Sequence, residues 1–292
     1  MPEMKSAANL DGAAPGPPPG RRNSAAAELA ALALDVPQAF AGAASPPWSL
    51  AAPSCVLPAD VGRNCTALAP FFPELGLCFF ETAACLAYGE ADLPRSLAAL
   101  PVRWHLHLPL DLPWGEGTPA VAGVILALAE KVAELAPWAY VLHPPRQPET
   151  LRDLALALAA GGLPPGSLVV ENIQGRDLER MWPVVRELDL GACLDLGHML
   201  EHGQQDFLDL PGLWAHARML HLNAPDTARP VRHAPLDRLD DAGRAVLGRM
   251  LSSFAPGGSV LLELFSPREL FDSLRYLSGF WAGLGASHKE SA

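Results

Sequence analysis

Residues 191–198, GACLDLGH, combine a short apolar run with two metal-binding side chains, Asp195 and His198, at its downstream end. The same arrangement recurs in three further runs, SLVVENIQG (167–175, with Glu171), ARMLHLNAP (217–225, with His221) and GSVLLELF (258–265, with Glu263). A continuous apolar run of this length is typical of a parallel strand that is buried on both faces. The sequence therefore predicts buried strands that each end in a potential metal ligand.

Working outward from these runs, the chain repeats the same unit along most of its length. The expected strands are 54–60, 75–81, 102–110, 139–145, 167–175, 191–198, 217–225 and 258–265, and helical patterns fill 120–137, 149–162 and 177–190. Eight strands that alternate with helices predict a single α/β domain, a (β/α)₈ TIM barrel. A doubly wound open sheet is the alternative, but it leaves the ligand at nearly every strand end unexplained. Neither a G-x-G-x-x-G turn nor a P-loop follows any strand.

The first fifty residues differ from the rest. Residues 1–22 contain APGPPPGRR and too few apolar side chains to bury, so we expect disorder there. An Ala-rich stretch at 24–35 predicts a short helix, and AGAASPPWSLAAPS (41–54) predicts a linker. We therefore expect an Ala/Pro-rich tail over 1–49 and the catalytic barrel over 50–292.

Composition limits the classes of partner. The 292-residue chain has 21 Lys+Arg against 32 Asp+Glu, a net charge of −11, and no basic cluster, which argues against a nucleic-acid partner. No apolar stretch is long enough to cross a membrane, and the N-terminus lacks the order of a signal peptide. The five cysteines include no C-x-x-C pair, as is typical of buried, reduced thiols. We expect a cytoplasmic protein with a small-molecule substrate; the sequence predicts no oligomeric state.

The carboxyl ends of barrel strands converge on one face, where barrel active sites form. We therefore expect one cluster of metal ligands, consisting of His107, His143, Glu171, Asp195, His198, His221, His233 and Glu263. Imidazole mixed with carboxylate suits zinc, manganese or iron, and the absence of cysteine argues against a structural zinc site. We expect only one of His105 and His107 to point into the barrel mouth, and prefer His107 because it is nearer the strand end. Each residue also has an ordinary structural explanation, such as a helix cap for Asp195, but together they favour a metal site.

This pattern resembles the xylose-isomerase-like barrel superfamily that includes the AP endonucleases of the endonuclease IV type. The matching elements are the early histidines His107 and His143, then Glu171, the Asp-x-x-His pair Asp195 and His198, His221, the loop histidine His233, and Glu263. The resemblance implies a cluster of two or three divalent metals. Val231 stands where the family usually has an aspartate two residues before the loop histidine, so we expect two ions, zinc or manganese.

Within that superfamily, several strings are similar to the cobamide-remodelling phosphodiesterases of the CbiR type. They are LPADVGRNC, HLHLPLDLPW, YVLHPP, VENIQGRDL, CLDLGHML, MLHLNAP, HAPLDRLD and LLELFSPREL, between about residues 54 and 281. The resemblance implies hydrolysis of the phosphodiester in the nucleotide loop of a cobamide such as adenosylcobalamin. The products would be cobinamide phosphate and the α-riboside of the lower-ligand base, which permits corrinoid salvage.

The residues themselves are compatible with this chemistry, because paired metals supply a nucleophile and neutralise phosphoryl charge. We expect Glu171, Glu263 and His198 to be catalytic, with the two glutamates bridging or orienting the metals and Glu263 assisting deprotonation of water. Four further residues are expected to support or contact the substrate: Trp114, Asn172, Asn223 and Arg146. Asn172 and Asn223 are also candidates for donors behind the ligands.

Alternative functions use the same residues. A sugar isomerase or epimerase on this barrel would use one metal with Glu171 and Glu263, but would leave His107 and His143 without a role. Cleavage of abasic DNA is disfavoured by the acidic charge. A non-catalytic corrinoid-binding protein would have no need of ligands at so many strand ends.

Overall fold

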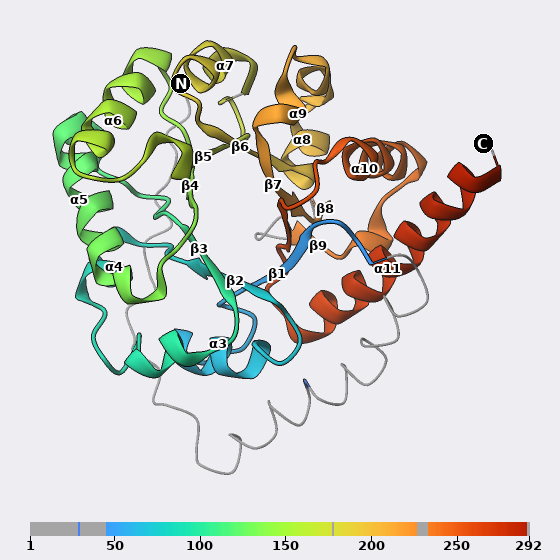
Figure 1. The fold of residues 1–292 in the computed structure, drawn as a ribbon, viewed down its shortest axis with the longest axis horizontal. Helices are drawn as coiled ribbons and strands as arrows, with labels where there is room; N and C mark the ends of the chain where they lie inside the picture. Colours follow the sequence, from blue (N-terminus) through green and yellow to red (C-terminus); the bar gives the residue numbers. More distant parts are fainter. Residues whose placement is uncertain (1–28, 30–44, 177, 227–232, 291–292) are drawn as a thin grey trace, which may run out of the picture.

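The computed structural model describes residues 29, 45–176, 178–226 and 233–290. In this part of the chain, eight parallel strands close into a barrel in the order β1-β10-β7-β6-β5-β4-β3-β2, and Figure 1 looks onto the ring with its helices outside. The barrel strands are β1 (Ser49–Pro53), β2 (Glu74–Cys78), β3 (Arg103–His107), β4 (Tyr140–Leu142), β5 (Leu168–Glu171), β6 (Gly191–Asp195), β7 (Ala217–Leu222) and β10 (Ser259–Leu262). The expected (β/α)₈ barrel is confirmed.

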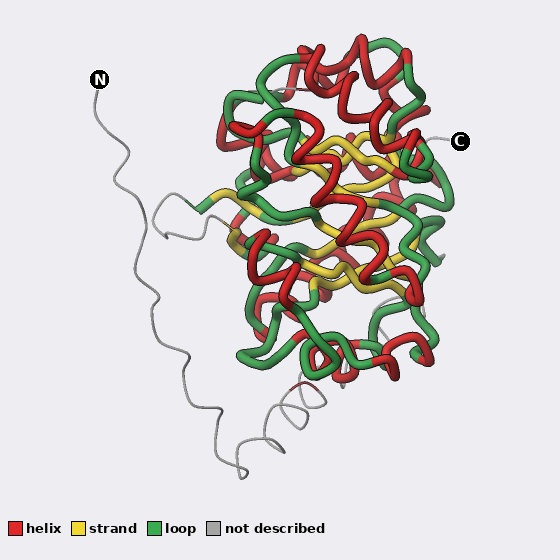
Figure 2. Tube along the Cα trace, turned by 90° about the vertical axis from the view of Figure 1, so that its left-hand side faces the viewer, coloured by secondary structure: helices red, strands yellow, loops and turns green. Residues whose placement is uncertain are grey.

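Helices surround this ring, and the side view in Figure 2 shows the strands as a central layer between them. The α-helices are α3 (Val61–Leu68), α4 (Thr82–Ala87), α5 (Thr118–Lys131), α6 (Pro148–Ala160), α7 (Leu178–Glu187), α8 (Leu196–His202), α9 (Leu213–His216), α10 (Asp241–Ser253) and α11 (Pro267–Glu290). Short 3₁₀ helices cover Arg95–Ala99, Trp114–Glu116, Ala133–Leu135, Pro165–Ser167, Gln205–Asp209 and Leu236–Arg238. A small antiparallel pair, β8 (Ala224–Pro225) with β9 (His233–Ala234), follows β7. The three expected helical patterns correspond to α5, α6 and α7.

Several helix starts follow directly from local sequence. The Asp60 side chain accepts a hydrogen bond from the Arg63 amide at 2.8 Å and caps α3, and Asp240 does the same for α10. Proline lies in the first turn of α5 and of α6, where its missing N–H has no intrahelical acceptor in any case. These signals place each helix just after the loop that leaves the strand before it.

The two faces of each strand pack into different cores. Alternate residues such as Tyr140 and Leu142 join the large cluster between strands and helices, whereas Val141 belongs to a small separate cluster. That small cluster consists of Ala139, Val141, Val169, Cys193 and Met219. Because side chains alternate across a strand, the small cluster fills the inside of the barrel. The inside of the barrel is therefore packed with side chains at the level of this cluster.

The first strand differs from expectation. β1 is Ser49–Pro53, inside the stretch predicted as a linker, and the predicted strand 54–60 is instead a turn that leads into α3. Ala51 and Ala52 are fully buried and pair with β10 and β2. Alanine has a low intrinsic preference for strands, so the pairing with two neighbours, and not local propensity, forms this strand.

Two other expectations concern the ends of the sequence and the membrane. The predicted disorder over 1–22 and the predicted helix over 24–35 fall outside the described residues, except for Leu29, which is helical and buried. Among the described residues, no helix combines the length and the apolar character needed to cross a bilayer.

Candidate metal centre

The interior face of the barrel leads from an apolar plug to a ring of ligands. Four interior residues are each followed, two positions later on the same face, by a histidine or an acid: Val141 by His143, Val169 by Glu171, Cys193 by Asp195, and Met219 by His221. His107 ends β3, and Glu263 directly follows β10. The strand ends thus bring six of the candidate ligands to one rim of the barrel; whether they bind a metal stays a prediction.

The first group of ligands, the outer set, consists of His107, His143 and Glu171. Both imidazole Nε2 atoms face the same carboxylate oxygen, Glu171 Oε2, at 3.2 Å from His107 and 3.3 Å from His143. His107 Nδ1 lies 2.9 Å from the Leu108 carbonyl, an acceptor, so this nitrogen carries the proton and donates it. In the neutral ring, Nε2 is then left with a free lone pair directed into the centre, as in a metal-ligating histidine.

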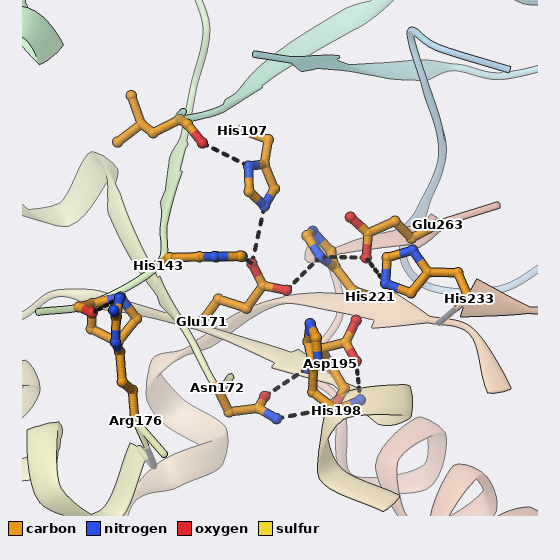
Figure 3. Close-up of polar contacts among 12 residues, drawn as sticks. His107, His143, Glu171, Asn172, Arg176, Asp195, His198, His221, His233 and Glu263 are labelled. Carbon is orange, nitrogen blue, oxygen red and sulfur yellow. Dashed lines mark hydrogen bonds and ion pairs between the residues drawn. The ribbon is translucent and has the colours of Figure 1, made fainter. Parts of the chain in front are cut away.

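The second group, the central set, consists of Glu171, Asp195, His221 and Glu263. Figure 3 shows His221 between the two glutamates, with Nδ1 at 3.1 Å from Glu171 Oε1 and 3.4 Å from Glu263 Oε2. All four residues are buried. Since Glu171 also belongs to the outer set, one carboxylate joins two neighbouring groups of ligands.

The third group, the helix-side set, consists of Asp195, His198 and His233. His198 lies on the first turn of α8 and not on the strand, because β6 ends at Asp195 and the helix begins at Leu196. Asp195 Oδ1 accepts the His198 amide hydrogen at 2.6 Å. Asp195 therefore caps a helix and also belongs to both the central and the helix-side sets. The two roles considered for it from the sequence, helix cap and candidate ligand, are compatible.

The donor atoms fit cations in their number, chemistry and spacing. Ligand atoms around a zinc-like ion at its usual bond lengths lie about 3.0–3.4 Å apart, and the four contacts of Glu171 and Glu263 given above span 3.1 to 3.4 Å. Several buried side-chain atoms of the described residues lack a hydrogen-bond partner, and three of them belong to these sets: His221 Nε2, His233 Nδ1 and Glu263 Oε2, the last of which lies 3.4 Å from His221 Nδ1. Buried polar atoms are rarely left unpaired, so a ligand set completed by cations explains the arrangement better than hydrogen bonding alone.

The charges of the buried carboxylates depend on the surrounding histidines. Burial raises the pKa of Glu171, but His221, His107 and His143 outweigh burial and hold the pKa well below the usual value. In the same way, burial opposes ionisation of Glu263, yet His221 and His233 lower its pKa. Burial raises the pKa of Asp195 to about 6 against the attraction of His198, with Glu263 and Glu171 adding to the rise. Three acids at one site thus require compensating positive charge.

Without a cation, His107 and His221 supply positive charge, whereas burial lowers the pKa of His143. Burial lowers the pKa of His107, but its hydrogen bond and Coulomb attraction to Glu171 prevail and raise the pKa to about 9. Burial likewise works against protonation of His221, whereas Cys193, Glu263 and Glu171 raise its pKa well above the usual value. A divalent cation bound at these side chains would displace these protons.

A layer of amides holds Asp195 from behind. Asn172 accepts the Asp195 amide hydrogen at 2.7 Å and donates to the Asp195 carbonyl at 3.1 Å and to Gln204 at 3.1 Å. Asn223 donates to Asp195 Oδ2 at 2.8 Å. Both asparagines are fully buried, so their place in the structure is behind the ligand and not on the surface that a substrate would meet.

His105 and His107 both lie on the interior face, since residues two apart on a strand point the same way. His105 is one layer deeper, where its Nδ1 lies 2.7 Å from Glu74 Oε1. Gly76 makes room for it, because a Cβ atom there would lie 2.4 Å from His105 Nε2. Both histidines therefore point into the barrel, and His107 is the one that lies at its mouth.

A cavity of about 470 Å³ opens over the ligands. Its wall includes His107, His143, Glu171, His198, His233 and Glu263, together with Cys55, Cys78, Phe80, Leu110 and Phe265. The last five were not predicted as site residues, although Phe80 and Phe265 each follow a strand end closely. A second cavity of about 300 Å³, between residues 88–97 and 130–135, has neither histidine nor cysteine in its wall.

Two remaining predictions concern the substrate, and one concerns the number of metal ions. Trp114 begins a 3₁₀ helix and packs partly buried against the main core, and it is not among the residues of the cavity wall. Arg146 is exposed beyond β4 and is also absent from that wall. Val231 lies outside the described residues. The contribution of Trp114 and Arg146 to substrate binding stays a prediction.

Solved structures share this fold, whereas no protein-family model matches the sequence and the search of curated proteins found no match. A D-tagatose 3-epimerase-like protein aligns with a TM-score of 0.62 at 15% identity, over 84% of this chain and 100% of that one. The probable 3-DHS dehydratase of Bacillus anthracis gives 0.60 at 12%, over 79% and 98%. A xylose isomerase-like TIM barrel protein from Mycobacterium smegmatis, in complex with magnesium, gives 0.54 at 12%, over 81% and 97%. At these identities the likeness concerns architecture: the chain has the fold of the xylose-isomerase-like TIM barrels.

Proposed function

We propose that this protein is a metal-dependent hydrolase that cleaves a phosphodiester with two or more divalent cations at the barrel rim. The observation that carries the proposal is the continuity of the three ligand sets, in which Glu171 belongs to the outer and central sets and Asp195 to the central and helix-side sets. Cations bound at sets that share carboxylates would lie close together, and paired cations of this kind would serve in-line displacement at phosphorus.

Different residues of the site would have different roles in such a reaction. Bound divalent cations supply a nucleophile at neutral pH and neutralise charge on the phosphoryl oxygens. Glu171 and Asp195 hold the sets in register, and the buried amides of Asn172 and Asn223 fix Asp195. Glu263 lines the cavity and, unlike Glu171, belongs to one ligand set alone. It is therefore the carboxylate placed to accept a proton from the attacking water.

The substrate that we propose is a cobamide, cleaved at the phosphodiester of its nucleotide loop to give cobinamide phosphate and the α-riboside of the base. Support for this substrate is the sequence resemblance to cobamide-remodelling phosphodiesterases and comes from the strings around the rim. Four of these strings contain His107, His143, Glu171 and Asp195 with His198, which belong to the three ligand sets. The acidic charge of −11 further favours a small substrate over a nucleic acid.

A second candidate is a sugar epimerase or isomerase that uses one cation in the central set. The solved structures with this fold favour it over cobamide hydrolysis, since they include the D-tagatose 3-epimerase-like protein and an L-ribulose 3-epimerase. The central set offers four ligands and could serve such an enzyme alone. In that case the outer and helix-side sets would have no function, which is why we place the hydrolase first.

The number of bound metals and the products separate the two candidates. We expect protein loaded with Mn²⁺ or Zn²⁺ to contain two or more ions per chain and to release the α-riboside from adenosylcobalamin, detected by mass spectrometry. Glu263→Gln should abolish release, whereas Glu134→Gln, which changes an exposed glutamate of the second cavity, should not. One ion per chain with turnover of ketohexoses would support the epimerase instead.

A third outcome is informative as well. Tight binding of adenosylcobalamin without turnover, with the metal sites loaded, would contradict the hydrolase and support a corrinoid-binding protein. An active Glu263→Gln enzyme would exclude the role given to that carboxylate.

A further inference from the structure

One wall of the metal cavity is an apolar ledge, formed by Phe80, Leu110 and Phe265, which we name the apolar shelf. Phe80 is 43% exposed and Leu110 is 50% exposed, although both are large hydrophobic side chains. Among the described residues, the other exposed large hydrophobic side chains are Leu86 and Leu156, and neither belongs to the cavity wall. Exposed apolar side chains therefore gather beside the metal ligands, where contact with a substrate would compensate for their exposure.

Two of the three shelf residues, Phe80 and Leu110, are held in place by hydrogen bonds between the loops that carry them. The Leu110 amide donates to the Phe80 carbonyl at 3.1 Å, and the Phe79 amide donates to the His107 carbonyl at 3.1 Å. Just beyond, Asp111 Oδ1 accepts from the Thr82 amide at 2.7 Å and from its hydroxyl at 2.8 Å. The loops after β2 and β3 are therefore joined to each other and to a metal-ligand strand, so the shelf is preorganised relative to the cations.

The rings continue the shelf up to the ligands themselves. Phe80 and Phe265 meet edge to face with ring centroids 6.1 Å apart. Phe265 in turn lies 5.0 Å from the ring of His233, a member of the helix-side set. A group that lies on the shelf would therefore be continuous with a group bound at the metal centre.

The rest of the wall offers little for a polyhydroxylated ligand. Apart from the metal ligands, the described residues of the wall are Cys55, Cys78 and the three shelf residues. None of these five carries a hydroxyl, amide or cationic side chain. Sugar hydroxyls buried against such a wall would lack hydrogen-bond partners, which costs free energy for each hydroxyl. A flat apolar group has no hydrogen bonds to lose when it is buried there.

We propose that the apolar shelf binds a flat, apolar ring system of the substrate while the phosphoryl group lies at the metal ligand sets. The occupant is thus an aromatic or conjugated ring joined to the scissile ester, and not a free sugar. Aromatic side chains arranged edge to face present a surface on which such a ring can stack. This inference rests on the proposed phosphodiester hydrolase and adds which residues of the cavity wall bind the ring-bearing part of its substrate.

Two phosphonates test the shelf without requiring turnover. Phenylphosphonate and methylphosphonate carry the same group toward the cations and differ only in the part that would reach the shelf. We expect the Mn²⁺-loaded wild-type protein to bind phenylphosphonate about 10-fold more tightly, equal to about 1.4 kcal/mol, as measured by isothermal titration calorimetry. In Phe80→Ala/Leu110→Ala, this preference should fall to about 2-fold or less while methylphosphonate binding is retained.

Leu156→Ala is the matched control, because Leu156 is a leucine with 51% exposure on α6, outside the cavity wall. It should keep the wild-type ratio of the two dissociation constants. Comparing ratios between variants cancels any difference in the intrinsic affinity of the two phosphonates for cations.

The possible failures are distinguishable. If both phosphonates bind but the ratio is the same in wild type and in Phe80→Ala/Leu110→Ala, the apolar shelf is not a binding surface, and the metal hydrolase stands. If neither phosphonate binds the loaded protein, both the hydrolase and the inference built on it are wrong. Thermal unfolding of each variant establishes that it is folded, which is expected because the substituted side chains are largely exposed.

Discussion

Gly197 shows how a single residue shapes the metal centre. It lies between Asp195 and His198, and a Cβ atom at this position would lie 1.7 Å from Asn223 Oδ1. Asn223 needs that space because its amide donates to Asp195 Oδ2. The glycine of the Asp-Leu-Gly-His sequence is therefore required by the close approach of a buried side chain, and not by an unusual backbone angle, since its φ is not positive.

Gly197→Ala should weaken metal binding without removing any ligand. The added methyl group would displace Asn223 and release one oxygen of Asp195, and loss of such supporting contacts typically costs about 10- to 100-fold in metal affinity. Competition with a fluorescent chelator measures this change. Gly123→Ala on α5 is the control, because its Cβ would meet no atom within 4 Å. Unchanged metal affinity in Gly197→Ala would contradict the role of Asn223.

At the residue scale, the candidate ligands could be predicted from the sequence, whereas the apolar shelf could not. Histidines and acids are rare in buried strands, so their position at the ends of apolar runs was informative, and the structure gathers all eight at the rim. Phe80 and Leu110 stand among other apolar residues in LGLCFFE and HLPLDLPW. Their exposure depends on how two loops pair, and no local pattern specifies that pairing.

At the scale of elements, β1 is the barrel strand that the sequence pattern did not predict. Seven of the eight expected strands correspond to barrel strands, but β1 is Ser-Leu-Ala-Ala-Pro and lies in a predicted linker. Its alanines are fully buried beside β2 and β10. The choice of small residues reflects the space left by neighbouring elements, which only the assembled barrel defines.

Ala52→Leu tests whether that space is limited. Ala52 belongs to the core between strands and helices and has no exposed surface, so a larger side chain should overpack it and reduce the free energy of unfolding by about 1–3 kcal/mol. Urea unfolding measures the change. Ala127→Leu, at an exposed position of α5, should stay within about 0.5 kcal/mol of wild type. Equal stability of the two variants would mean that the core around Ala52 can accommodate a larger side chain.

Adjacent strands are also joined by a buried polar cluster beneath the metal centre. Glu74 on β2 accepts from His105 on β3 at 2.7 Å and from the Trp138 indole at 2.9 Å, just before β4. Burial raises the pKa of Glu74, but the hydrogen bonds from His105 and Trp138 outweigh burial and lower the pKa below its usual value of 4.5. Burial lowers the pKa of His105 itself, so the hydrogen bond, and not a full charge on His105, is the contribution that holds at neutral pH. Ionised Glu74 therefore stabilises the folded state at pH values above about 4.5.

The sign of this shift predicts a pH-dependent loss of stability in Glu74→Gln. A carboxyl whose pKa is lower in the folded state stabilises the fold above its unfolded pKa and loses that contribution as the pH falls through its folded pKa. We expect Glu74→Gln to be less stable than wild type by about 1–3 kcal/mol at pH 7, with the difference shrinking below pH 4.5. Urea unfolding with EDTA present measures it without bound metal. Glu90→Gln, which removes an exposed ion pair with Arg95, should show no such trend, and a constant difference for Glu74→Gln would contradict the assignment.

At the scale of the whole molecule, the metal centre connects elements that are far apart in the chain. Its ligands come from β3, from the segments that follow β4 and β10, from β5, β6 and β7, and from α8 and β9. Ions bound there would join these elements at one end of the barrel and would bind only the folded protein. Binding that is specific to the folded state adds to its stability by mass action, about 4 kcal/mol at a free metal concentration of 1,000 times the dissociation constant.

Removal of metal should therefore destabilise the entire barrel and not only its rim. We expect EDTA to lower the Tm of the Mn²⁺-loaded protein by about 10 °C, since about 4 kcal/mol corresponds to a shift of this order in a domain of this size. In Glu171→Gln, which changes the carboxylate shared by two ligand sets, the Tm should no longer respond to EDTA, whereas Glu134→Gln should respond like wild type. Differential scanning calorimetry with increasing Mn²⁺ measures the response. A wild-type Tm that does not depend on metal would show that these ligands hold no cation in the folded protein.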